Sequence, residues 1–102
     1  ASHPKIAYVN YCGLPGDKYH AVAEKYLPNG SCGVVSFGVK GGREAAAAFM
    51  GHLKIAAIET HVADARTCCL NPGVQPDLVR MSCGLEDKND LIHDIAQALD
   101  QI

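Results

Sequence analysis

The spacing of apolar residues changes repeatedly along this 102-residue chain, and this change constrains the fold more than any other feature. Some segments alternate apolar and polar residues or hold short β-branched runs, which is typical of strands. Others repeat apolar residues every three or four positions, which is typical of helices. The pattern predicts strands over residues 5–11, 32–39, 65–70 and 77–83, and helices over residues 17–27, 43–54 and 87–98.

The order of these segments predicts an α/β (α+β) fold. We expect a two-layer sandwich of an about four-stranded, mainly antiparallel sheet with helices on one face. The other face of the sheet would then have no cover from within this chain. A chain of 102 residues suffices for one such domain and is too short for two. Residues 55–62 fit neither pattern, so no element is predicted there.

The charge composition argues against two classes of partner. Nine Lys and Arg residues against eleven Asp and Glu residues give a net charge of -2, so no basic surplus exists to bind a nucleic-acid backbone. The longest apolar run, residues 45–50, is far short of the roughly 20 residues that cross a bilayer. We expect a soluble, cytoplasmic protein with no nucleic-acid or membrane partner.

The cysteines and histidines give no metal-ligating pattern. The five cysteines are an odd number without a Cys-x-x-Cys pair, which favours a reduced, cytosolic protein. Cys68, Cys69 and Cys83 lie in strand-like runs and are expected to be buried and inert, with a metal or redox role as the alternative. The five histidines lack ligand spacing, so no zinc site is predicted.

Arg80 is the most informative single residue. Alternation in the last predicted strand divides its residues between two faces, with Val79, Met81 and Cys83 on one and Leu78, Arg80 and Ser82 on the other. A guanidinium in mid-strand needs an anion, and its planar fork matches a carboxylate. The residues alone favour an internal carboxylate, Asp64 or Glu86, and leave a bound ligand as the alternative.

A glycine pair stands at the predicted start of the second helix, in the sequence Lys40-Gly41-Gly42-Arg43. Free N–H groups and two cations there would suit a phosphate. The spacing matches neither a P-loop nor a dinucleotide-binding motif. A tight turn from strand to helix is therefore the favoured interpretation.

A series of motifs, in order along nearly the whole chain, resembles one enzyme family. The motifs are His3-Pro4-Lys5, Val9-Asn10-Tyr11-x-Gly13-Leu14-Pro15, Tyr26-Leu27-Pro28-x-Gly30, the run from Ser36 to Ala45, the run from Ala63 to Thr67, and the run from Leu78 to Asp87. Together they closely resemble the C-terminal domain of the O-acetylhomoserine sulfhydrylases. These belong to the pyridoxal-phosphate-dependent Cys/Met-metabolism family, with cystathionine γ-synthase and methionine γ-lyase.

The resemblance implies the small C-terminal domain of a fold-type-I enzyme, with residues 1–102 forming a single substrate-binding domain. In such enzymes a large upstream domain holds pyridoxal phosphate on a lysine. The arginine of the Val-Arg-x-Ser-x-Gly motif binds the α-carboxylate of the amino-acid substrate, and the matching residue is Arg80. His61 and Thr67 are expected as its neighbours. The resemblance thus favours a bound ligand over an internal carboxylate as the partner of Arg80. It also implies that the uncovered sheet face contacts the large domain.

The implied activity is a transferase reaction of methionine biosynthesis, in which O-acetyl-L-homoserine and sulfide or a thiol give L-homocysteine or methionine plus acetate. Cystathionine γ-synthase, methionine γ-lyase or a non-catalytic α/β oligomerisation module are the alternatives. None of the six lysines has the family's Ser/Thr-rich context. We therefore expect no catalytic residue and no covalently held cofactor in this chain, which alone would be inactive.

Two further expectations follow from the resemblance. Relatives carry a longer Ser/Thr-rich, His-containing loop where this sequence passes directly from Pro72 to Gly73, so a loop is expected to be missing there. Relatives also form dimers that share active sites and assemble as tetramers, so we expect a homo-oligomer.

Overall fold

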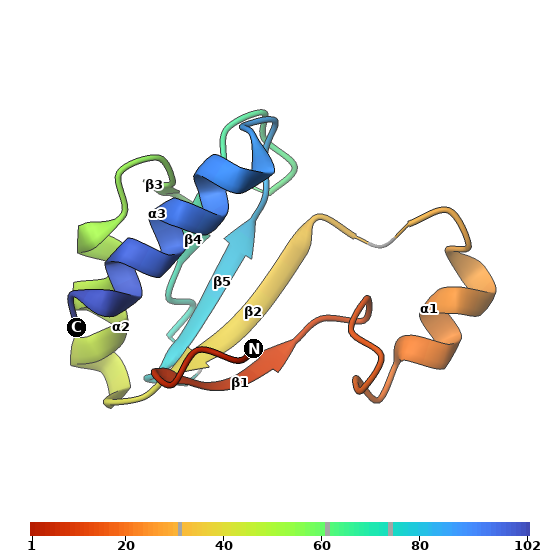
Figure 1. The fold of residues 1–102 in the computed structure, drawn as a ribbon, viewed down its shortest axis with the longest axis horizontal. Coiled ribbons are helices and arrows are strands. Elements are labelled where there is room, and N and C mark those ends of the chain that lie inside the picture. The colour runs from red at the N-terminus through yellow and green to blue at the C-terminus, as the bar shows by residue number, and fades with distance from the viewer. Residues whose placement is uncertain (31, 61, 74) are drawn as a thin grey trace.

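The computed structural model describes residues 1–30, 32–60, 62–73 and 75–102 (Figure 1). The described residues form the following elements: β1 (Ile6–Asn10), α1 (His20–Tyr26), β2 (Val34–Val39), α2 (Gly42–His52), β3 (Ala57–Ile58), β4 (Cys68–Leu70), β5 (Leu78–Ser82) and α3 (Lys88–Asp100). Within these residues, no helix is long and apolar enough to cross a bilayer.

The strands form one mixed sheet in the order β1-β2-β5-β4-β3. All neighbours are antiparallel except β3 and β4, which run parallel. The predicted α/β class is confirmed, but the sheet has five strands because β3 forms within the segment that showed no pattern. This strand has two residues, too few for a period, and backbone bonds from Ala57 N to Thr67 O (2.9 Å) and from Glu59 N to Cys69 O (3.1 Å) hold it in place.

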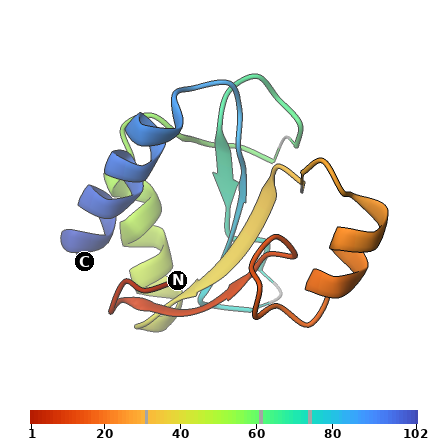
Figure 2. The same cartoon turned by 45° about the vertical axis from the view of Figure 1, so that its right-hand side comes forward.

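The core lies between one face of the sheet and the helices α2 and α3, which Figures 1 and 2 show side by side on that face. Its largest wholly buried residues include Phe49, Met81, Val39 and Val79. The rings of Phe37 on β2 and Phe49 on α2 meet edge to face with centroids 5.6 Å apart. Two of the three predicted helices therefore form the expected second layer, and the third, α1, does not.

The helix α1 lies apart from that layer, beyond the end of β1 (Figure 2). Its apolar side chains lie largely in water, since Ala23 is buried but Tyr19, Val22 and Tyr26 are exposed. The helix is shorter than the predicted range 17–27, and Asp17 is not its N-cap. The helix begins at His20, and the Asp17 carboxylate instead accepts hydrogen bonds from the backbone of Tyr11 (3.2 Å) and Tyr19 (2.9 Å), closing the turn before it.

The starts of α2 and α3 follow local chemistry. Gly41 and Gly42 have positive φ angles of 108° and 76°, a region open to glycine and costly for other residues. The glycine pair thus turns the chain from β2 into α2, as the favoured interpretation required. Asp87 caps α3 by accepting from the backbone N–H groups of Asn89 and Asp90.

Candidate functional site

Arg80 lies on the sheet face opposite the two core helices. Val79 and Met81, its neighbours on β5, are buried in the core, so the alternation predicted from the sequence is confirmed. Ser36 on β2 and Leu70 on β4 are its cross-strand partners. Directly paired residues point to the same face of a sheet. Arg80 is half-buried in the middle of this row, which we call the open face.

The Arg80 guanidinium makes one hydrogen bond among the described residues, from Nη2 to the backbone oxygen of Thr60 at 3.0 Å. No ion pair joins Arg80 to another residue in the described part of the chain. A guanidinium has five N–H donors, so one carbonyl does not saturate it. Such a group on an open face is suited to bind an anion, and a carboxylate matches its fork in bidentate geometry.

The two internal carboxylates considered for Arg80 are engaged elsewhere. Asp64 Oδ1 accepts from the backbone N–H of Arg66 at 2.9 Å. Glu86 accepts three hydrogen bonds from Thr67: from the backbone N–H at 2.8 and 3.1 Å and from the hydroxyl at 2.6 Å. The hydroxyl and then the backbone N–H of Thr67 hold the pKa of Glu86 below its usual range.

Thr67 is wholly buried, and its hydroxyl both donates and accepts a hydrogen bond. Besides donating to Glu86, it accepts from the backbone N–H of Gly84 at 2.8 Å. These bonds hold residues 65–67 against the end of β5. The role of Thr67 as a neighbour of the substrate carboxylate stays a prediction, because its described contacts are all within the chain. His61, the other predicted neighbour, lies outside the described residues.

The structure corrects one cysteine prediction. All five cysteines are free, and Cys68 and Cys69 are buried as expected. Burial raises the pKa of the Cys69 thiol to about 11, which keeps it protonated and inert. Cys83, however, is exposed, because β5 ends at Ser82 and the chain leaves the covered part of the sheet. Among the described residues, no group of three or more His, Cys, Asp or Glu side chains is placed to hold a metal ion.

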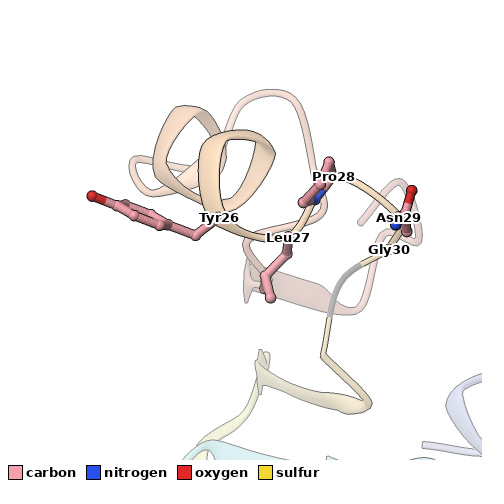
Figure 3. A pocket seen from close by; sticks show the side chains of 5 residues that line it. All are labelled: Tyr26, Leu27, Pro28, Asn29 and Gly30. Carbon is pink, nitrogen blue, oxygen red and sulfur yellow. The ribbon is translucent and has the colours of Figure 1, made fainter.

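Two hollows formed by described residues lie away from Arg80. One of about 380 Å³ is lined by five consecutive residues at the end of α1, residues 26–30 (Figure 3). In that view the Tyr26 ring points away from Pro28 and Asn29, so the hollow is shallow rather than enclosed. A second, of about 310 Å³, is an apolar groove between β1 and α3 on the core side of the sheet.

Two residues near Arg80 could not be found from the sequence. Thr60 and Ala63 lie in or beside the segment without a pattern, yet Thr60 accepts from Arg80 and the Ala63 N–H donates to Ser82 Oγ at 3.0 Å. Alternation did place Ser82 on the face of Arg80. No sequence signal indicated what its hydroxyl would bind.

The fold and the site define an α/β domain that presents a half-buried arginine on the sheet face opposite its two core helices. A sequence profile of the Cys/Met metabolism PLP-dependent enzymes matches the chain over residues 1–72 and again over residues 54–100. The chain belongs to this family, which confirms the resemblance seen in its motifs.

The relatives carry names from within that family. The homocysteine synthase of Schizosaccharomyces pombe is 38% identical over 114 aligned residues, which cover 96% of this chain and 27% of that protein. O-acetyl-L-homoserine sulfhydrylase 1 of Thermus thermophilus is 38% identical, covering 94% of this chain and 27% of its own length. The structure of O-acetylhomoserine sulfhydrylase from Wolinella succinogenes has a TM-score of 0.87 and 31% identity, covering 95% of this chain and 28% of that one.

The lysines of this chain do not fit the covalent attachment of pyridoxal phosphate. Five of the six side chains are exposed and Lys5 is half-buried, and all six are described residues. A lysine that reacts with a carbonyl group is typically activated by burial or by a neighbouring cation. None of the six lysines has the buried surroundings typical of a lysine that reacts with a carbonyl group.

Proposed function

We propose that residues 1–102 are the C-terminal, substrate-binding domain of a pyridoxal-phosphate-dependent O-acetylhomoserine sulfhydrylase. The whole enzyme would convert O-acetyl-L-homoserine and sulfide or a thiol into L-homocysteine or methionine and acetate. The observation that carries the proposal is the position of Arg80, half-buried on the sheet face opposite α2 and α3 and without an ion pair among the described residues. The names of the two curated relatives support the choice of reaction.

Arg80 would bind the α-carboxylate of the substrate. A bidentate pair fixes two oxygen positions at once, so it orients the whole amino acid and not only its charge. Orientation matters because the bond to be broken must be aligned with the group that accepts its electrons. Arg80 would thus bind and orient the substrate, while residues of the upstream domain would move protons.

The cofactor would be held by the larger part of the enzyme. This chain spans 27% of the length of both curated relatives, and its lysines lie at or near the surface. We propose that the open face meets this larger part, that the chain alone is inactive, and that the whole enzyme is a cytoplasmic homo-oligomer. Its five free cysteines are in keeping with a reducing compartment.

A loop would be missing between Pro72 and Gly73. The alignment with the Schizosaccharomyces pombe protein extends over 114 positions although the chain has only 102 residues, so that relative holds additional residues. We place them after Pro72, where the motif series of the family is interrupted.

The role of Arg80 is tested in a full-length protein that contains this domain. Arg80→Ala should lower kcat/KM for O-acetylhomoserine by a factor of about 30 to 1000, because a lost charge pair costs about 2 to 4 kcal/mol. Arg80→Lys should recover only part of the loss, since an ammonium cannot form the bidentate pair. Arg43→Ala is the matched control, as Arg43 is exposed on α2. An unchanged kcat/KM in Arg80→Ala would refute the role.

A further inference from the structure

The segment that fixes the Arg80 guanidinium has no regular structure of its own. Thr60, whose carbonyl oxygen accepts from Arg80, comes two residues after the end of β3. A carbonyl in such a segment can orient a guanidinium only if the segment is itself held. What holds it therefore decides how well Arg80 is oriented.

Ser82 supplies a point of attachment for this segment. Its hydroxyl oxygen accepts from the backbone N–H of Ala63, three residues after Thr60, at 3.0 Å. Ser82 is only 3% exposed, so this bond is protected from water. Ala63 has a φ of 60°, a costly backbone conformation for a residue with a Cβ, and such a conformation persists where a contact enforces it.

The geometry of β5 links this attachment to the arginine. Arg80 and Ser82 are two residues apart on one strand, so both side chains project from the open face. Arg80 contacts the segment at Thr60 and Ser82 contacts it at Ala63. The segment is thus bound to β5 at two points on the same face.

We propose that Ser82 is a positioning residue for Arg80: it holds Ala63 against β5 and so keeps the nearby Thr60 carbonyl at the guanidinium. Arginine has large rotamer freedom, and a side chain that is oriented before binding loses less of it when the ligand arrives. The catalytic consequence rests on the proposed function of Arg80. The positioning contact does not.

The test measures the mobility of Arg80 in the 102-residue chain. The sequence has three arginines, so the ¹H–¹⁵N heteronuclear NOE of each Nε reports fast motion for one resolved side chain. In the parent chain, Arg80 should give a higher NOE than the exposed Arg43. Ser82→Ala should lower the Arg80 value to that of Arg43, and Ser82→Cys should also lower it, since sulfur is a weak acceptor.

Ser36→Ala is the matched control. Ser36 is the cross-strand neighbour of Arg80 on the open face, but its hydroxyl lies 3.5 Å from the Asn10 side-chain nitrogen and bonds there. This variant should leave the Arg80 NOE unchanged. A folded Ser82 variant with an ordered Arg80, or an equal loss of order in Ser36→Ala, would overturn the proposal.

Kinetics of the full-length protein separate this inference from the proposed function. Ser82→Ala should raise KM for the amino-acid substrate about five- to tenfold with little change in kcat, the effect of one lost hydrogen bond. If Ser82→Ala frees Arg80 in the NMR experiment while Arg80→Ala leaves kcat/KM unchanged, the positioning contact stands and the substrate role fails. If Arg80 stays ordered, the positioning role fails whatever the kinetics.

Discussion

At the scale of single residues, Asp94 is a buried carboxylate that accepts several hydrogen bonds. It accepts from the backbone N–H groups of Lys54 and Ile55 (2.8 Å each) and Ala56 (3.4 Å), and from the side chain of Gln97 (3.1 Å). Burial raises the pKa of Asp94, but the hydrogen bonds, those of Lys54 and Ile55 foremost, outweigh it, so the pKa is lowered. Asp94 thereby fixes the chain between α2 and β3.

This lowered pKa gives a pH dependence of stability with a definite sign. A carboxylate with a lower pKa in the folded state stabilises the fold above its unfolded pKa, about 3.9 for Asp, and the effect is lost as pH falls through the folded value. We expect acid to destabilise the chain below about pH 4, and Asp94→Asn to show a flatter pH profile. Urea unfolding at a series of pH values from neutral to acidic measures the free energy of unfolding and its pH dependence. Asp90→Asn, at an exposed position one turn earlier, should keep the parent slope.

Removal of the Asp94 side chain should lower the free energy of unfolding more than neutralisation of its charge does. Asp94→Ala leaves the backbone N–H groups of Lys54, Ile55 and Ala56 without this acceptor, and a buried group left so costs about 1 to 3 kcal/mol. We expect a loss of about 3 kcal/mol in the free energy of unfolding at neutral pH. A loss no larger than that of Asp90→Asn would contradict this account.

Asp94 and Arg80 show which residue roles a sequence can predict. The face of Arg80 is predictable because a strand has a strict period of two. In the helix predicted over residues 87–98, Asp94 is buried and Ile92 is 58% exposed, although acidic side chains usually face water and isoleucine usually faces the core. The sequence does not show this direction, because it depends on the backbone N–H groups of Lys54 and Ile55, which donate to Asp94.

At the scale of elements, the strands with clear alternation were predicted well, and those held by contacts outside the strand were not. The predicted ranges 5–11 and 77–83 enclose β1 and β5 with one residue to spare at each end. The strand predicted over residues 65–70 is shorter in the structure, where β4 covers Cys68–Leu70. Residues 65–67 instead contact the residues that follow β5, because Thr67 is hydrogen-bonded to Glu86 and Gly84.

The contact between Gly84 and residues 65–67 leaves no room for a side chain. A Cβ at Gly84 would lie 2.2 Å from the Ala65 carbonyl oxygen and 2.6 Å from the Arg66 carbonyl carbon, both backbone atoms that cannot rotate away. We expect Gly84→Ala to cost about 2 kcal/mol of unfolding free energy, typical of overpacking. It should also raise the pKa of Glu86 toward its usual value, as Thr67 moves away from the carboxylate.

Gly51→Ala controls for the generic effect of the substitution. Gly51 lies in α2, and a Cβ added there would have no other atom within 4 Å, so alanine should stabilise the helix by up to about 1 kcal/mol. Thermal unfolding gives both changes, and a carboxyl NMR titration gives the Glu86 pKa. Equal stabilities for the two alanine variants would show that the contact at Gly84 is not tight.

At the scale of the whole molecule, two surfaces bear on association. One is the open face, where Leu70 and Arg80 are half-buried, and the other is the exposed stripe of α1, where Tyr19 is 58% and Tyr26 is 69% exposed. Side chains of this kind gathered on a protein surface commonly mark interfaces. The first surface was predicted, because helices on one face of the sheet leave the other face without cover from within the chain. The second was not predicted, because the apolar spacing in residues 17–27 is the same as in a helix that packs on the core.

Under the proposed function the open face would meet a larger part of an enzyme, so we expect the isolated chain to associate with itself through this face. Light scattering after size-exclusion chromatography should give a mass that rises with concentration above the 10.8 kDa of one chain. Leu70→Glu should shift the mass toward the monomer, since a charge at the centre of an interface resists loss of water. Val22→Glu tests the stripe of α1 in the same way and should leave the association unchanged. If Val22→Glu dissociates the oligomer and Leu70→Glu does not, α1 is the interface. If the chain is a monomer at all concentrations, neither surface suffices for self-association.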